Sequence, residues 1–191
     1  GFNMKGYYKD AKYGKYAGEF ERKYIFPHLN TLMSGSLPKN DPFVQEWKDQ
    51  GGKWVIHCTV PRDTDEKPLT VQEAYDFLAS TAGYTEPAAT GPIADEFGDS
   101  EPICSIYAEV VRKLKAAERF KDKAYYPFAN KLYNGPEGRD LVAALVETGG
   151  MIPWKNYLKE QPSEIAAWQF LHQQLLTPVR EYREKCPGSV P

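Results

Sequence analysis

Short apolar segments alternate with segments of helical periodicity along most of this chain. Segments with strand character are apolar, β-branched or aromatic and usually end at Gly or Pro, and they occupy residues 1–5, 53–60, 91–97, 124–128 and 150–154. Helical segments lie between and around them, at residues 11–24, 42–50, 70–79, 100–117, 139–148 and 163–185. Because successive parallel strands need a helix-length crossover, the alternation predicts an α/β fold with a parallel sheet of about five strands.

Two of the predicted helices carry clear local signals. Thr70 and Glu73 have the spacing of a capping box, which places a helix start at residue 70. The last helix shows an apolar stripe that is typical of a face turned to the core, formed by Ile165, Trp168, Leu171, Leu175 and Val179. Pro178 interrupts that pattern, so we expect a kink or a break there.

The length of 191 residues predicts a single α/β domain over residues 1–191. A complete (β/α)8 barrel usually needs roughly 250 residues, whereas a five-stranded doubly wound open sheet fits this length. No glycine-rich phosphate loop follows a predicted strand, which disfavours the nucleotide-binding open sheets. We therefore favour TIM-barrel-like units that form part of a barrel, with the open sheet as the alternative.

Charge and hydropathy narrow the classes of partner. Acidic and basic residues are interspersed and the net charge is -2, so neither nucleic acid nor an anionic membrane is an expected partner. The chain shows no apolar run of the roughly 20 residues that span a bilayer and no signal-peptide core. Cys58, Cys104 and Cys186 lack the spacing of a metal site, and Cys58 and Cys104 are predicted to be packing residues. We expect no cofactor, while compartment and oligomeric state stay open.

The most concentrated chemistry is the Asp95-Glu96 pair after the apolar residues Ile93 and Ala94. Ligands of parallel α/β proteins bind at the carboxyl ends of the strands, so this pair points to a catalytic cleft. Adjacent strand residues point to opposite faces, and only one acid can face the site. Glu96 shares its face with small Ala94, whereas the face of Asp95 also holds bulky Ile93 and Phe97 and is predicted to pack against outer helices. Glu96 is therefore the predicted general acid/base, with Asp95 as its orienting partner.

Glycoside hydrolysis usually needs a second carboxylate across the scissile bond. Glu160 is the best-placed candidate, because it follows the predicted strand that ends at Trp154. The alternative for Glu160 is the first turn of the last helix, where its charge would offset the helix dipole.

Aromatic and amide side chains at the predicted strand ends could bind a sugar. Aromatic rings stack on sugar faces, and hydroxyl, imidazole and amide groups supply hydrogen bonds. The predicted substrate-binding residues are His57, Tyr126, Asn130, Trp154, Asn156 and Tyr157. Each has a plainer interpretation as a packing or backbone-bonding residue.

The segment Gly91-Pro-Ile-Ala-Asp-Glu-Phe97, the Tyr-rich strand after it and residues 154–160 resemble the central units of (β/α)8-barrel glycoside hydrolases. In that family an acid commonly closes a middle strand, which corresponds here to Glu96 with Asp95 beside it. The resemblance implies hydrolysis of a carbohydrate. Two alternatives stay open: a non-catalytic domain that binds carbohydrate or protein, and a metal-dependent hydrolase that uses His57 with the two acids.

Overall fold

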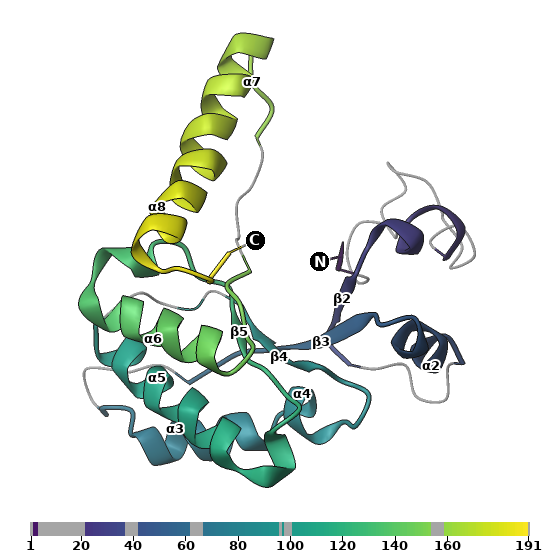
Figure 1. Cartoon of the computed structure of the whole chain (residues 1–191), viewed down its shortest axis with the longest axis vertical. Coiled ribbons are helices and arrows are strands. Elements are labelled where there is room, and N and C mark those ends of the chain that lie inside the picture. The colour runs from purple at the N-terminus through teal and green to yellow at the C-terminus, as the bar shows by residue number, and fades with distance from the viewer. Residues whose placement is uncertain are drawn as a thin grey trace.

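The computed structural model describes residues 2–3, 22–36, 42–61, 67–95, 97, 101–153 and 159–190. Its strands are β1 (Phe2–Asn3), β2 (Thr31–Ser34), β3 (Lys53–Cys58), β4 (Gly91–Ala94) and β5 (Tyr126–Pro127). Its α-helices are α2 (Pro42–Asp49), α3 (Val71–Ser80), α4 (Ala82–Thr85), α5 (Glu101–Ala116), α6 (Pro136–Glu147), α7 (Glu164–Leu171) and α8 (Thr177–Lys185). Short 3-10 turns lie at Phe26–His28, Glu118–Phe120 and Leu132–Asn134. Figure 1 shows the resulting α/β arrangement.

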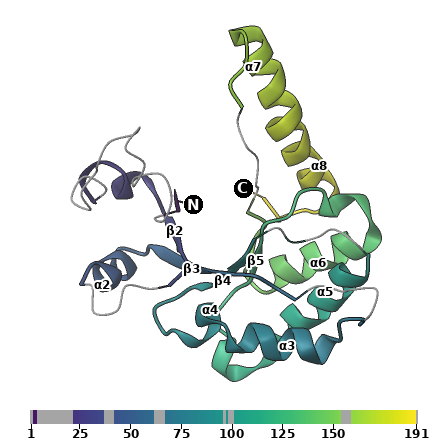
Figure 2. The ribbon, with the colours of Figure 1, turned by 180° about the vertical axis from the view of Figure 1, so that it is seen from behind.

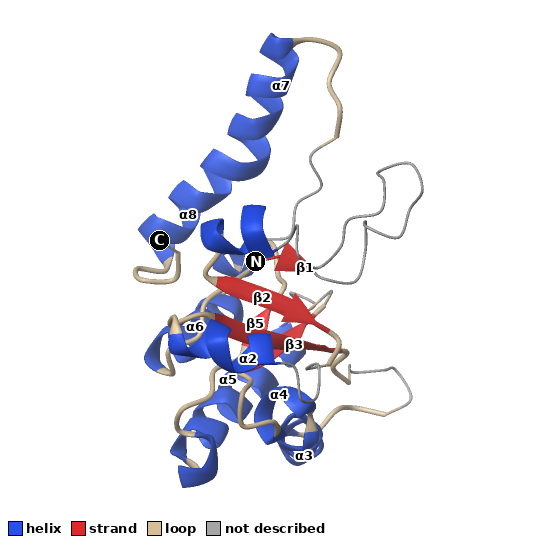
Figure 3. Ribbon diagram, turned by 90° about the vertical axis from the view of Figure 1, so that its right-hand side faces the viewer, coloured by secondary structure: helices blue, strands red, loops and turns tan. Residues whose placement is uncertain are grey.

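All strand pairs of the sheet are parallel, and their spatial order β1-β2-β3-β4-β5 follows the order of the chain. The predicted parallel α/β fold is therefore confirmed. A doubly wound sheet reverses its strand order at one point, and no such reversal occurs among the strands that the structure describes. Figure 3 shows the strands crossing the middle of the molecule beside the helices.

The helices α2 to α6 cover one face of this sheet, which we call the helix face. Trp54 on β3 packs with α2 through Phe43 and Trp47. Cys58 points the same way, since it lies four residues further along the strand, and it packs against the cluster formed by α3, α5 and α6. Figures 1 and 2 show these helices on the same side of the strands.

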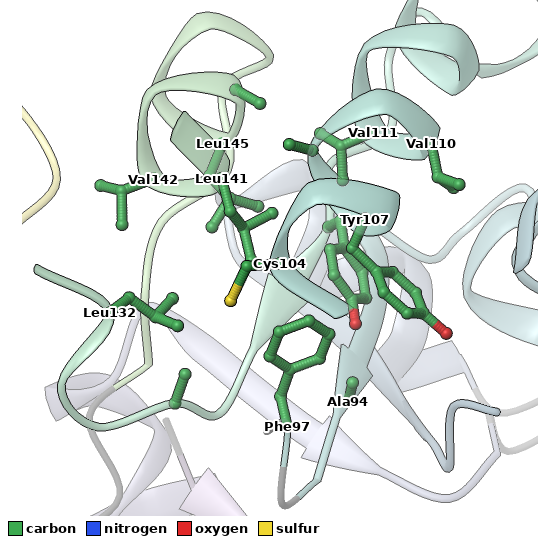
Figure 4. Close-up of a cluster of buried hydrophobic side chains, with 14 of the residues drawn as sticks. Ala94, Phe97, Cys104, Tyr107, Val110, Val111, Leu132, Leu141, Val142 and Leu145 are labelled. Atoms are coloured by element: carbon green, nitrogen blue, oxygen red, sulfur yellow. The ribbon is translucent and has the colours of Figure 1, made fainter. Parts of the chain in front are cut away.

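The main core lies between the helix face and the helices α3, α5 and α6. Tyr107 on α5 and Tyr125 beside β5 stack with ring centroids 6.0 Å apart, and both side chains are fully buried. Phe97 meets the Tyr107 ring edge-on at 5.1 Å. The aliphatic side chains of α5 and α6 complete the cluster (Figure 4). This core holds β4 and its carboxyl end in place.

The other face of the sheet, which we call the opposite face, carries a small apolar cluster of its own. Val55, Ile93 and Tyr126 belong to it, and all three side chains are buried. Gly91 lies in the same row as Val55. A Cβ atom at Gly91 would lie 1.7 Å from the carbonyl oxygen of Ala124, so the close approach of the chain before β5 requires a glycine here.

The helix at the end of the described chain stands away from the rest of the molecule (Figures 1 and 2). It joins α7, a π-helical turn (His172–Leu176) and α8 into one continuous element. The base of α8 is anchored by Tyr182, whose hydroxyl accepts from the Leu132 amide at 3.1 Å and donates to the carbonyl of Asn130. None of the residues of α7 and the π turn is buried.

Two sequence-based expectations for this helix need correction. The stripe was predicted to face the core, but Ile165 and Trp168 are 72% and 64% exposed. Periodicity identifies an apolar side of a helix and does not identify what covers it. Pro178 does not break the helix, because the π turn immediately before it changes the hydrogen-bonding pattern where a proline would clash with the carbonyl four residues earlier.

One observed strand was not predicted, and one predicted strand is not observed. β2 was not predicted, because Thr31–Ser34 is short and lacks a strong local signal. Residues 150–153 were predicted as a strand and have no regular structure. Most of the helix predicted at residues 11–24 lies outside the described residues, and β1 covers residues 2 and 3 of the segment predicted at 1–5.

Candidate functional site

Three side chains of the opposite face form one row across the carboxyl ends of the sheet. His57 on β3 pairs in register with Ile93 on β4, which in turn pairs with Tyr126 on β5. Partners in a parallel register point to the same face, so the three side chains are neighbours. His57 is half-buried, while Ile93 and Tyr126 are buried. The row therefore consists of two buried side chains, with the half-buried polar side chain of His57 at one end.

Asp95 lies one residue beyond β4, next to His57. Its backbone amide donates to the carbonyl of Cys58 at 3.3 Å, which extends the pairing of β3 and β4 past the last strand residue. The distance between Nε2 of His57 and Oδ2 of Asp95 is 3.7 Å. The side chains are 38% and 39% exposed. An ion pair at this exposure contributes at most about 1 kcal/mol to stability, so the pair is accessible without being a structural necessity.

The predicted orientation of the two acids rested on a face assignment that is wrong. Ala94 lies on the helix face in the main core, and Ile93 lies on the opposite face. Asp95 therefore accompanies His57 at the end of the opposite face and does not pack against the outer helices. Phe97 does belong to the main core, because β4 ends at Ala94 and the alternation of the strand does not continue. Glu96, the predicted general acid/base, lies outside the described residues.

Tyr126 lies on β5 in the same row, beside Ile93. Burial raises the pKa of Tyr126, so the phenol stays protonated over the neutral range and can donate a hydrogen bond. The chain continues to Phe128, whose amide donates to the carbonyl of Ala94 at 2.8 Å and whose carbonyl accepts from the Phe97 amide at 3.0 Å. These backbone hydrogen bonds hold the segment after β5 against the segment after β4, in which Asp95 lies.

The remaining predicted site residues lie elsewhere or outside the described chain. Asn130 is exposed, and its carbonyl accepts from Tyr182 in the anchor of α8. Glu160 is exposed and lies four residues before α7, whose amino-terminal end is the free end of the protruding helix, away from the sheet (Figures 1 and 3). It is not in the first turn of that helix, which begins at Glu164 after the cap Ser163. The predicted sugar-binding residues outside the described chain are Trp154, Asn156 and Tyr157.

Cys58 and Cys104 pack as predicted. Cys104 and Cys186 are buried, and Cys58 is half-buried on the helix face of β3. Burial raises the pKa of the Cys58 thiol to about 12, which removes the thiolate that a cysteine nucleophile needs. Within the described ranges, no three His, Cys, Asp or Glu side chains gather closely enough to hold a metal ion.

The sequence brought His57 and Asp95 together only in the metal-dependent alternative, which grouped His57 with the two acids. In the favoured interpretation they had separate roles, His57 as a sugar-binding group and Asp95 as a partner of Glu96. Their proximity follows from the register of β3 against β4, which places the residue after Ala94 next to the end of β3. A local sequence pattern carries no signal for such a register.

Comparisons with models of protein families, with curated proteins and with solved structures found no match to this chain. In the described part of the chain, no helix combines the length and the apolar character that crossing a membrane requires. The site is therefore interpreted from its own geometry.

Proposed function

We propose that this protein is a glycoside hydrolase whose active site lies at the carboxyl ends of β3, β4 and β5. The observation that carries the proposal is the half-exposed His57–Asp95 pair on the opposite face, 3.7 Å apart. A carboxylate that ends a strand of a parallel sheet, with an imidazole beside it and a buried tyrosine in the next strand, suits catalysis better than packing.

The topology supports this proposal. Parallel strands in chain order with right-handed crossovers bring every crossover helix to the same face of the sheet. The strands β1 to β5 and the helices α2 to α6 follow that rule. It is also the arrangement of strands and helices in part of a TIM barrel, so we propose TIM-barrel-like units. In such units, the carboxyl ends of the strands are the usual position of an active site.

Hydrolysis of a glycosidic bond needs one carboxyl group to protonate the leaving oxygen and a second to act as an anion. Asp95 is suited to the anionic role, because solvent and the imidazole of His57 can both stabilise its charge. We propose Glu96, the next residue in the chain, as the general acid/base; two adjacent acids can serve one site here because β4 ends at Ala94 and the alternation of strand side chains does not extend to them. Tyr126 would donate a hydrogen bond to the sugar.

The test is turnover of a broad panel of aryl glycosides and polysaccharides by the wild type, Asp95→Asn and Glu96→Gln. Each substitution removes the charge and keeps the shape of the side chain. We expect both variants to lose at least about 100-fold in kcat and to retain sugar binding. Asp76→Asn is the matched control, since Asp76 is exposed on α3 and accepts from Gln72 at 2.9 Å, far from the strand ends.

Three outcomes contradict the proposal in different ways. Unchanged turnover by both variants in an active preparation would remove the two acids from the mechanism. Sugar binding without turnover of any glycan would identify a non-catalytic carbohydrate-binding domain. Turnover that is lost with a chelator and restored by a divalent cation would identify a metal-dependent hydrolase built on His57 and Asp95.

A further inference from the structure

The protruding helix carries a stripe of exposed apolar side chains along one side. Five large apolar residues of α7 and the π turn are at least one-third exposed, and they recur three or four residues apart with a final adjacent pair. They are Ile165, Trp168, Leu171, Leu175 and Leu176. We call this set the apolar stripe. The ring of His172 belongs to the same side, because its centroid lies 5.3 Å from that of Trp168.

The polar side of the same helix identifies what kind of partner fits. Gln169, Gln173 and Gln174 are exposed there, and residues 165–179 contain no Asp, Glu, Lys or Arg. Helices that lie on anionic membranes carry Lys and Arg on their polar side, and this segment has none. A stripe centred on an exposed tryptophan and flanked by uncharged polar residues is suited to another apolar protein surface.

The charges at the two ends of the stripe are opposite. Glu164 stands at its amino-terminal end and Arg180 follows its carboxyl-terminal end, and both are exposed. Two copies of the helix that run antiparallel bring Glu164 of each copy beside Arg180 of the other. Two parallel copies would instead place like charges together at both ends. Charge complementarity therefore favours a second copy in the antiparallel orientation.

The shape of the molecule agrees with that orientation. The stripe lies on the part of the helix that projects beyond the sheet and its covering helices, and the anchor at Tyr182 lies at the opposite end (Figures 1 and 2). In an antiparallel pair the two bodies lie at opposite ends of the paired helices, so they do not collide. In a parallel pair the bodies would compete for the same space.

From these observations we infer that the apolar stripe is a self-association surface, through which two copies of this chain form an antiparallel helix pair. In this register Trp168 of each copy lies opposite Leu176 of the other and is the largest apolar contact, and the Glu164–Arg180 contacts set the direction. The inference does not depend on the proposed catalytic activity, since it uses none of the residues at the strand ends.

The first experiment measures the mass of the wild type and of Trp168→Glu by light scattering and sedimentation over a range of concentrations. We expect a dimer for the wild type and a weakening of its association by at least about 100-fold in the variant. Gln173→Glu introduces the same charge on the polar side of the helix and should leave the dimer intact. Circular dichroism and thermal unfolding of both variants check that the fold is retained.

The second experiment tests the direction of the pair. Glu164→Arg and Arg180→Glu should each weaken the dimer by about tenfold, because each creates two like-charge contacts. The double variant, and an equimolar mixture of the two single variants, should recover association. A parallel pair predicts no weakening in either single variant, because its end contacts are repulsive already.

A wild type that stays monomeric at high concentration, or a dimer that survives Trp168→Glu, would overturn the inference. Binding of the monomer to lipid vesicles through Trp168 would also overturn it. An unchanged dimer in both single charge variants would overturn the antiparallel orientation.

Discussion

The body of the molecule and its protruding helix use the same types of residue in opposite ways. Leu141 and Leu145 on α6 are fully buried against α5, whereas Leu171 and Leu175 on the helix are 38% and 37% exposed. The stripe of the protruding helix was predicted to face the core, but of these two segments α6 is the one that buries its apolar face within the chain. The comparison teaches that an apolar helical stripe indicates a surface that packs against another apolar surface, and that this second surface can lie outside the fold.

The largest difference in stability should appear when one leucine side chain is truncated to alanine in each region. Leu145→Ala removes a fully buried side chain from the main core and should lower the free energy of unfolding by about 2–5 kcal/mol. Leu171→Ala should change it by less than about 0.5 kcal/mol in the monomer. Urea unfolding followed by circular dichroism at low protein concentration measures both. Equal losses in the two variants would show that the helix is part of the core.

A smaller loss of stability is expected where the base of the protruding helix is anchored to the body. Tyr182→Phe removes the hydroxyl that accepts from the Leu132 amide and donates to the carbonyl of Asn130, in a buried position. We expect a loss of about 1–3 kcal/mol and faster hydrogen exchange at the Leu132 amide.

Tyr75→Phe is the control for this contact, because Tyr75 is half-buried and the Lys113 ammonium lies over its ring. If Tyr182→Phe were as stable as this control, the hydroxyl of Tyr182 would not hold the helix to the body.

The helix caps give a finer version of the comparison. Thr70 accepts from the Glu73 amide at 3.2 Å at the start of α3, and Ser163 accepts from the Ala166 amide at 3.2 Å at the start of α7. Thr70→Ala should lower the free energy of unfolding by about 1 kcal/mol, because α3 packs in the main core. Ser163→Ala should fray only α7, with a change in global stability below about 0.5 kcal/mol.

Calorimetry and hydrogen exchange of the α7 amides separate the two effects. If Ser163→Ala lowered the free energy of unfolding of the whole molecule as much as Thr70→Ala does, the predicted difference between the two caps would be wrong.

The smallest predicted effect is a pH dependence that belongs to the body alone. Hydrogen bonds from Lys67 and from the backbone and side chain of Thr70 lower the pKa of Glu73 from the usual 4.5 to about 2. Because the pKa is lower in the folded state, the stabilisation is present above about pH 4.5 and is lost as the pH falls towards 2. Glu73→Gln should lack this part of the acid-induced loss. Matching acid unfolding curves for the two proteins would contradict this origin.

The elements of the body could be predicted because their signals are local. The Thr70–Glu73 capping box is present as predicted, and the apolar segments at 53–60 and 91–97 contain β3 and β4. The strand β2 was missed because its four residues acquire their strand identity from pairing with β1 and β3. Pairing between distant segments leaves little trace in either segment alone.

The candidate site was predicted in part, because its residues carry local signals whereas their arrangement depends on how distant segments pair. His57, Asp95 and Tyr126 were all recognised as strand-end residues, and the structure brings them to one face. The orientation of Asp95 was wrong because the size of a neighbouring side chain does not tell which face of a strand meets the helices. Ala94 belongs to the main core on the helix face, and Ile93 fills the opposite face.

The order of the strands has a consequence for how the chain folds. Among the described strands, each pairs with its neighbours in sequence, and no later strand lies between two earlier ones. The sheet can therefore grow one strand at a time in the order of synthesis, since each completed strand–helix unit already offers the edge on which the next one assembles. A chain with this topology need not hold an early segment open for a distant partner while it leaves the ribosome.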